Sequence, residues 1–251
     1  MGHPRRCAGR HHTGLVVLLT ASLSLAAGSV EAATFGGDLT AVSDYIYRGV
    51  SQNYGDPAVQ VDLHLGTDSG FFVGAWGSSL SSHGFRPNFE TQLYAGKRFE
   101  LSTDWSATTQ IVDYAYFGTH GRRSYDYQEV SLSLAYLDSL NFSVAITPNA
   151  VRYLGGYRIG RYPAYDADVT GQWHLVGDLF ATAGAGYYYL SGPADPDAGT
   201  PGYAYGNAGL ALAVRSWRLE VGYFVAEHKS EYFFPYVTSD SRFAASLSWR
   251  F

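Results

Sequence analysis

LNFSVAIT, at residues 140–147, alternates apolar and polar or small side chains without a break. One face of this stretch carries Leu140, Phe142, Val144 and Ile146. A period of two is that of a β-strand with one apolar face, whereas an α-helix repeats every 3.6 residues. The same alternation recurs at 59–66, 217–226 and 242–251. Strand formation is therefore a property of the whole chain and not of one segment.

Twelve segments of this kind follow one another along the chain. They lie near 35–47, 57–66, 70–80, 88–100, 103–116, 124–137, 139–147, 164–175, 178–190, 203–214, 217–228 and 239–251. Their connections alternate between tight turns, such as 215–216, and long links, such as 148–163. An even number of strands with short turns at one end and long loops at the other is typical of outer-membrane barrels. The sequence therefore predicts an all-β fold, a transmembrane antiparallel up-and-down β-barrel with both termini at the short-turn end.

Proline gives an independent check of this strand pattern, because it cannot donate to a β ladder. After residue 32, the prolines all fall in the long links or at their edges: Pro57, Pro87, Pro148, Pro163, Pro193, Pro196, Pro201 and Pro235. We therefore expect no strand interior to contain proline. A secreted soluble β-sandwich is the competing interpretation, but strands in globular proteins average about 5–6 residues. The segments predicted here are about twice that length, long enough to cross a bilayer at a tilt.

Residues 1–32 are predicted to form a secretory signal peptide, which leaves residues 33–251 as the barrel. Arg5, Arg6 and Arg10 precede an apolar run at 14–27, and residues 30–32 form a small-residue cleavage site. A retained anchor is the alternative, although this run is shorter than the about 20 residues of a spanning helix. Cleavage removes Cys7, the only cysteine, so neither a disulfide framework nor a Cys-rich zinc site is expected.

Aromatic residues near the predicted strand ends are expected to form the interfacial girdles of a membrane barrel. They are Tyr45, Tyr47, Trp76, Tyr116, Tyr136, Trp173, Tyr187, Tyr189, Trp217 and Trp249. Twelve tilted strands enclose a bore that inward side chains narrow to at most ~12 Å. A small hydrophilic solute fits such an opening, whereas a folded protein does not.

Parity along the strands selects the side chains that face this bore. The charged and imidazole residues expected to shape its selectivity are Asp62, His64, Glu90, Glu129, Asp168, His174, Arg218, Glu220 and Arg242. Acidic residues are in excess on predicted strands two to eight, and arginines are concentrated on strands eleven and twelve. Facing walls of opposite charge are one hypothesis, because rings of charge set ion preference. The alternative is that these groups pair with one another, as burial of charge demands.

Three neighbouring motifs carry a family resemblance: SDYIYRGVSQ at 43–52, DPAVQ at 56–60 and SGFFVGAWGS at 69–78. Together they resemble the TorF-type family of predicted porins, also catalogued as the proteobacterial Gcw_chp domain. The close match covers roughly residues 35–80. The resemblance implies an outer-membrane location and a pore, and it brings no established substrate.

Two further groups of residues are assigned from these motifs and from the C-terminal end. Asp44 and Arg48 share parity at the end of the first predicted strand, and we expect them to brace residues 49–56 against the lumen wall. Solute binding is the alternative role for this pair. The final FAASLSWRF, residues 243–251, looks like the signature by which barrels are recognised for assembly. Its aromatic and apolar positions include Phe243, Leu247, Trp249 and Phe251.

The partners follow from the charge balance and the predicted location. Lys+Arg 17 against Asp+Glu 22, with net charge −5, argues against nucleic-acid binding. We expect a monomer in the bacterial outer membrane, contacting lipid and lipopolysaccharide, a small hydrophilic solute and, during insertion, the barrel assembly machinery. Loop arginines are candidates for lipid phosphates, with solvated loop charge as the equal alternative: Arg86, Arg122, Arg123, Arg152, Arg158 and Arg161.

Catalysis receives no support from motifs, so we predict that the chain is not an enzyme and needs no cofactor or metal. Neither H-E-x-x-H nor Gly-x-Ser-x-Gly is present. His64 and His174 are placed on opposite walls of a twelve-stranded ring, too far apart for a dyad. The predicted function is a passive channel for small hydrophilic solutes. A non-conducting structural or adhesive barrel is the main alternative, and a lipid-modifying enzyme is the weaker one.

Overall fold

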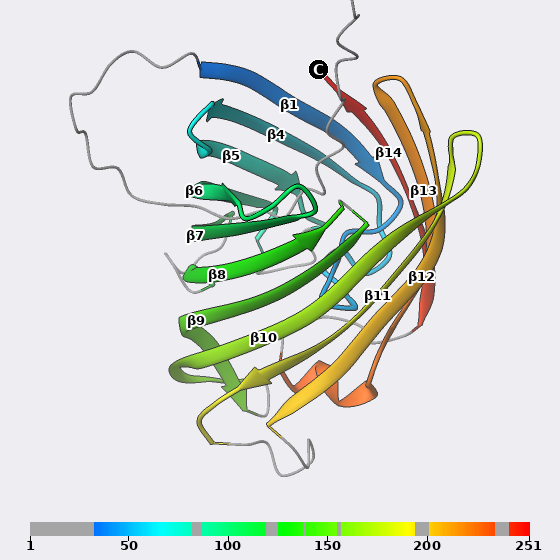
Figure 1. Cartoon of the computed structure of the whole chain (residues 1–251). Coiled ribbons are helices and arrows are strands. Elements are labelled where there is room, and N and C mark those ends of the chain that lie inside the picture. The colour runs from blue at the N-terminus through cyan, green and yellow to red at the C-terminus, as the bar shows by residue number, and fades with distance from the viewer. Residues whose placement is uncertain are drawn as a thin grey trace, which may run out of the picture.

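The computed structural model describes residues 33–81, 87–118, 125–137, 139–154, 157–193, 201–233 and 241–251. Within them, twelve antiparallel strands close into one barrel (Figure 1), in the ring order β1-β14-β13-β12-β11-β10-β9-β8-β7-β6-β5-β4. The barrel strands are β1 (Ala33–Val42), β4 (Ala58–Thr67), β5 (Phe71–Ser79), β6 (Phe89–Glu100), β7 (Trp105–Phe117), β8 (Tyr127–Tyr136), β9 (Leu140–Leu154), β10 (Tyr157–Val176), β11 (Leu179–Leu190), β12 (Gly202–Val214), β13 (Trp217–Ala226) and β14 (Arg242–Arg250). The predicted closed all-β barrel is confirmed. The predicted leader, residues 1–32, lies outside the described residues.

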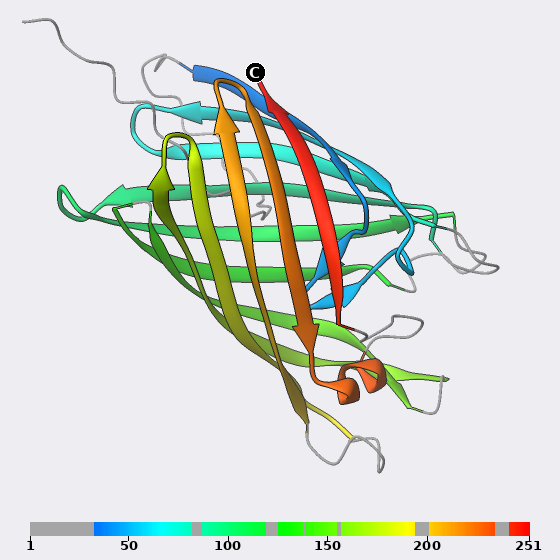
Figure 2. The same ribbon diagram turned by 90° about the vertical axis from the view of Figure 1, so that its right-hand side faces the viewer.

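The first and last strands close the ring. Leu39 of β1 is paired with Val61 of β4 on one side and with Trp249 of β14 on the other. Backbone hydrogen bonds in both directions join Gly37 and Phe251, at 3.1 and 3.0 Å. The start of β1 and the C-terminus therefore lie side by side at the short-turn end (Figure 2). A closed sheet leaves no edge of unpaired N–H and C=O groups.

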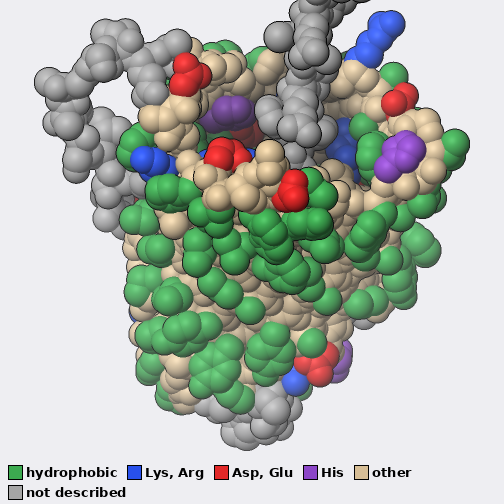
Figure 3. Space-filling view, viewed as in Figure 1, with side chains coloured by type: hydrophobic (Ala, Val, Ile, Leu, Met, Phe, Trp, Pro, Cys, Tyr) green, Lys and Arg blue, Asp and Glu red, His purple; other side chains and the backbone are tan. Residues whose placement is uncertain are grey.

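The outer face of the barrel is apolar. Leu132, Val144 and Val221 are 42%, 53% and 45% exposed, and each has a polar, small or charged neighbour that points inward. Figure 3 shows hydrophobic side chains over the wall, with charged ones gathered at its two ends. The four C-terminal signature residues share this outer face: Phe243, Leu247, Trp249 and Phe251. Among the described residues, no helix has the length and apolar character needed to cross a membrane.

Three predicted strand boundaries are wrong, for two different reasons. The first barrel strand ends at Val42 and not at residue 47, because the chain turns into the bore at Ser43. Strands β9 and β10 continue through the predicted link 148–163, pairing as a ribbon as far as Leu154 and Tyr157. Pro148 and Pro163 therefore lie within strands, against expectation. The pairing register shifts between Tyr162 and Ala164, and such a bulge accommodates proline.

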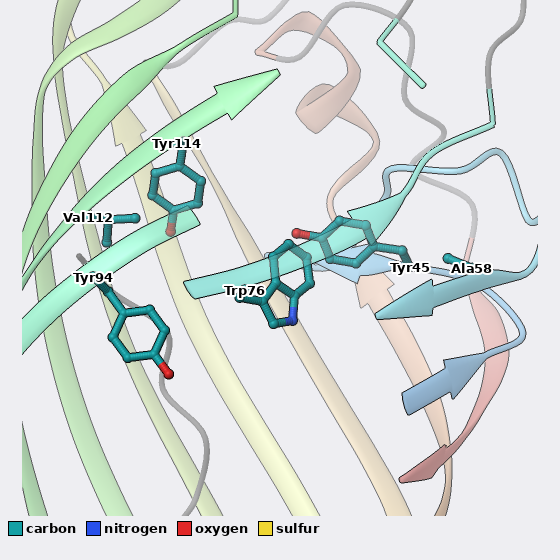
Figure 4. Close-up of a cluster of buried hydrophobic side chains, with 6 residues drawn as sticks. All are labelled: Tyr45, Ala58, Trp76, Tyr94, Val112 and Tyr114. Carbon is teal, nitrogen blue, oxygen red and sulfur yellow. The ribbon is translucent and has the colours of Figure 1, made fainter. Parts of the chain in front are cut away.

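Part of the predicted aromatic girdle lies inside the barrel. Tyr45 and Trp76 are buried with their rings 5.5 Å apart (Figure 4) and belong to a cluster that Tyr47 and Tyr116 flank. Side chains alternate between the two faces of β5, and those of Val73 and Ala75 lie on the outer face. Trp76 therefore points inward. The other predicted aromatics with large outer exposure are Trp173, Tyr187, Tyr189, Trp217 and Trp249.

Candidate functional site

A short hairpin enters the bore directly after β1. Strands β2 (Ile46–Tyr47) and β3 (Val50–Ser51) form this inner hairpin, residues 46–51, with Tyr47 paired to Val50. Its two-residue turn has positive φ at both positions, 49° at Arg48 and 78° at Gly49, as a type I′ turn requires. A Cβ on Gly49 would stand 2.7 Å from the Val225 carbonyl oxygen on the wall. Glycine thus allows both the turn and its close approach.

The root of the inner hairpin is fixed to the wall on both sides of β1. Asp44 is buried and forms an ion pair with Arg242 of β14, at 3.0 Å. The Ser51 hydroxyl donates a 2.6 Å hydrogen bond to the same carboxylate. Tyr45 rests on Trp76 of β5. Asp44 therefore holds the loop in place through its ion pair with Arg242. Arg48, the other residue expected to brace this loop, forms its ion pairs with other residues.

The tip of the inner hairpin is fixed on the far side of the bore. Arg48 Nη2 lies 2.8 Å from Glu129 Oε2 on β8, and Arg48 Nε lies 3.2 Å from Asp166 Oδ1 on β10. These strands stand nearly opposite β1 in the ring. The guanidinium also lies over the rings of Tyr47 and Tyr188, 4.7 and 5.0 Å from their centroids. The inner hairpin and the Arg48 side chain at its tip together therefore span the bore.

Neighbouring carboxylates keep the Arg48 guanidinium at this tip charged. Burial alone would lower the pKa of Arg48, but Asp166 and Glu129 outweigh it, and the net effect raises that pKa above its usual value. The hydroxyl of Tyr203 adds a hydrogen bond to the Arg48 carbonyl oxygen, at 3.1 Å. The arginine is therefore a permanent cation with backbone and side chain both engaged.

Open space lies on both sides of the inner hairpin. An upper cavity is lined by tyrosines, among them Tyr116, Tyr127 and Tyr153. A lower cavity extends from the hairpin toward the short-turn end. Tyr47 and Arg48 line both cavities, so the hairpin tip is the partition between them. Glu220 lines the lower cavity and two further cavities deeper in the bore.

The lower cavity is strongly acidic. A single arginine, Arg48, faces its five carboxylates: Asp44, Glu129, Asp166, Asp168 and Glu220. Two more arginines reach its edge, Arg242 toward Asp44 and Arg218 toward Glu220 at 3.0 Å. Acidic groups still outnumber basic ones. Asp168 has no ion-pair partner in the part of the chain that the structure describes.

The remaining predicted lumen residues occupy separate positions. Asp62 is buried on the inner face, 2.7 Å from His64 Nδ1, and accepts a 2.6 Å hydrogen bond from the Tyr94 hydroxyl. Glu90 is buried and accepts a hydrogen bond from the Gln92 amide. His174 is exposed at the short-turn end, where its ring contacts the Gly177 carbonyl oxygen. The structure thus brings Glu129 and Asp168 together near Arg48, and it leaves the two histidines apart.

Two residues of the Arg48 site were absent from the predicted set. Asp166 has the same parity as Asp168 on β10, and this signal was available in the sequence. Tyr188 lies between two outward tyrosines, so its inward direction also followed from alternation. The sequence around Asp166 and Tyr188 does not indicate that Arg48, from the first loop, contacts them.

The loop arginines have varied surroundings. Arg152, a predicted lipid contact, is fully buried; its guanidinium donates to the carbonyl oxygens of Leu190 and Pro193. The prediction is wrong for this residue, because its charge is used to tie two outer segments together. Arg161 donates to the Asn149 carbonyl oxygen, and Arg158 is exposed. Arg86, Arg122 and Arg123 lie outside the described residues.

Solved structures of several porins have a similar fold. The NanC porin matches with TM-score 0.57 and 12% identity, over 84% of this chain and 97% of that one. The KdgM porin matches with TM-score 0.52 and 12% identity, over 86% and 99%. The KdgM porin in complex with disordered oligogalacturonate matches with TM-score 0.52 and 11% identity, over 87% and 99%. At such low identity these likenesses concern the fold alone.

Sequence comparison identifies the family. No curated protein matches the chain. The profile of a family described as "Bacterial protein of unknown function (Gcw_chp)" matches residues 26–218, well beyond the stretch that carried the resemblance. The Gcw_chp part of that resemblance is confirmed, and the chain belongs to the Gcw_chp family of bacterial proteins.

Proposed function

We propose that this protein is an outer-membrane porin, a passive channel for small hydrophilic solutes, as the resemblance to TorF-type porins implies. The observation that carries the proposal is a barrel with an apolar outer face and a charged interior. An apolar outer wall is stable against acyl chains, and a polar lumen is stable when filled with water. The porin folds that resemble it agree with this reading.

The inner hairpin sets the size of solute that the proposed channel admits. It crosses a bore of at most ~12 Å and places Tyr47 and Arg48 between the two cavities. The carboxylates of the lower cavity favour cations over anions at this constriction. We therefore infer a narrow channel with cation preference.

Conductance across a planar bilayer tests the proposal directly. The purified, membrane-inserted protein is expected to give steady current steps. In a KCl gradient the reversal potential is expected to have the sign of a cation-preferring channel. Silence from protein whose barrel is shown to be folded by circular dichroism would contradict the proposal.

Neutralising Asp168 is expected to weaken the cation preference. Asp168→Asn removes one unpaired negative charge from the lower cavity, and we expect the K⁺ to Cl⁻ permeability ratio to fall roughly two-fold. The matched control is Asp113→Asn, the same chemical change on the exposed outer face of β7. Equal permeability ratios for both variants and the wild type would show that Asp168 is not part of the ion path.

A non-conducting structural barrel is the second candidate, and one observation favours it. The inner hairpin is anchored at both root and tip, so the bore is obstructed at one level. In that case folded protein stays silent in bilayers, and conduction appears only after the hairpin is removed.

A further inference from the structure

Arg48 occupies a site that the barrel wall builds. Glu129 on β8 and Asp166 on β10 supply two carboxylates, and Tyr188 on β11 supplies an aromatic face 5.0 Å from the guanidinium carbon. A flat cation held by carboxylates at its edge and by a ring against its face has both of its preferred contacts. These three wall residues are called the cation cage.

The cation cage is held in shape by the wall itself. Glu129 accepts a 2.7 Å hydrogen bond from the Thr147 hydroxyl of β9. Both carboxylate oxygens of Asp166 accept from the Tyr205 hydroxyl of β12, at 3.1 Å. Neither bond involves Arg48. The carboxylates therefore keep their positions when the arginine leaves, and such preorganisation favours binding of another cation.

The cation cage borders both cavities. Tyr188 lines the upper cavity, and Glu129 and Asp166 line the lower one. The approach through the upper cavity passes a continuous series of rings, in which Tyr116 lies 6.1 Å from Tyr125 and Tyr125 lies 6.3 Å from Tyr153. Aromatic faces and edges along this path suit a partly apolar cation better than a fully hydrated ion.

We propose that the cation cage binds small organic cations carrying a guanidinium group, and that Arg48 is the chain's own tethered occupant of this site. A solute guanidinium takes over the hydrogen bonds to Glu129 and Asp166, and Arg48 withdraws with the inner hairpin. The exchange makes and breaks hydrogen bonds only. This inference deepens the proposed porin function by naming its solute class, and as a route for transport it rests on that function.

Emptying the cation cage tests the proposal. A tethered occupant competes at the high effective concentration of an intramolecular group, so its removal raises the apparent affinity for a free ligand. With agmatine as probe and the detergent-solubilised full barrel in a calorimeter, Arg48→Ala is expected to bind at least about tenfold tighter than the wild type. Butylurea, a neutral probe, is expected not to bind. Arg48→Gln, which keeps a polar side chain, provides the same comparison if the alanine variant fails to fold.

Two further variants decide where agmatine binds. Adding Glu129→Gln and Asp166→Asn to Arg48→Ala is expected to abolish the gain, because the cage then lacks its charges. Arg250→Ala removes another lumen arginine, one that pairs with Asp38 at 3.2 Å and does not contact the inner hairpin, so it is expected to bind like the wild type. Absence of a gain in Arg48→Ala and Arg48→Gln, or a gain that persists without the two carboxylates, overturns the inference. Binding without bilayer conduction supports the cage and contradicts the porin, whereas conduction without binding does the reverse.

Discussion

Removal of the inner hairpin raises the single-channel conductance of the protein roughly five-fold or more, because a two-stranded hairpin with its side chains fills most of the bore. Two strands ~4.8 Å apart, with their side chains, are about 10 Å wide. The free bore of twelve strands is at most ~12 Å. Tyr47 and Arg48 border both the upper and the lower cavity, so their removal joins the two spaces directly.

The deletion removes the Ser51 hydrogen bond to Asp44 but can keep the rest of the root. The backbone N–H of Gln52 donates a 2.7 Å hydrogen bond to the Tyr45 carbonyl oxygen, so these two residues already stand opposite each other. Replacing residues 46–51 with Asn-Gly closes the gap with a two-residue turn and keeps the Asp44–Arg242 ion pair.

A matched control separates this effect from a general change at the outer mouth. The helical turn η1 (His228–Tyr232) follows β13 at the same end of the barrel, and Gly/Ser replacement there is expected to leave conductance unchanged. Equal conductance of the hairpin deletion and the wild type would mean that another element limits the current. Current from the deletion variant alone would identify the native protein as a closed barrel.

The barrel could be predicted because its cause is local. Along β8 and β9, each side chain faces either the outside or the lumen. The sequence of these strands therefore alternates between apolar residues and polar or small ones, and this alternation can be read without the structure. Alternation does not reveal where a strand leaves the sheet. Tyr45 and Tyr47 continue the pattern beyond Val42, although both rings lie inside the barrel. An aromatic residue at a strand end suits either a lipid interface or a packed lumen, so its type alone does not decide between them.

The functional site was predicted only in part, because its contacts join distant parts of the chain. Parity placed Glu129 and Asp168 in the lumen, and the motif at the end of the first strand drew attention to Arg48. The contact between Arg48 and Glu129 joins residues 81 positions apart, and it depends on a hairpin that crosses the ring. Nothing in one strand specifies which residue of the opposite wall a loop will meet. The pairing was therefore set by tertiary structure.

An arginine on the outer face of β8 is expected to destabilise the protein far more than one on the inner face. Leu132 lies midway along β8 and is 42% exposed on the outside, so Leu132→Arg places a charge against acyl chains. The expected loss of unfolding free energy in phospholipid vesicles is about 2–4 kcal/mol. Ser131 lines the lower cavity beside its carboxylates, so Ser131→Arg is expected to change stability by less than about 1 kcal/mol.

The comparison of these two variants tests which solvent each face of the sheet meets. In a soluble β-sandwich the order reverses, because the apolar row becomes the dry core and the polar row meets water. Denaturant titration of both variants in vesicles gives the two free energies under one condition. A greater loss for Ser131→Arg than for Leu132→Arg would mean that the apolar row is not in contact with lipid. The inner hairpin and the cation cage would then lie in a packed interior, and neither conduction nor exchange of Arg48 for a solute would follow from the geometry.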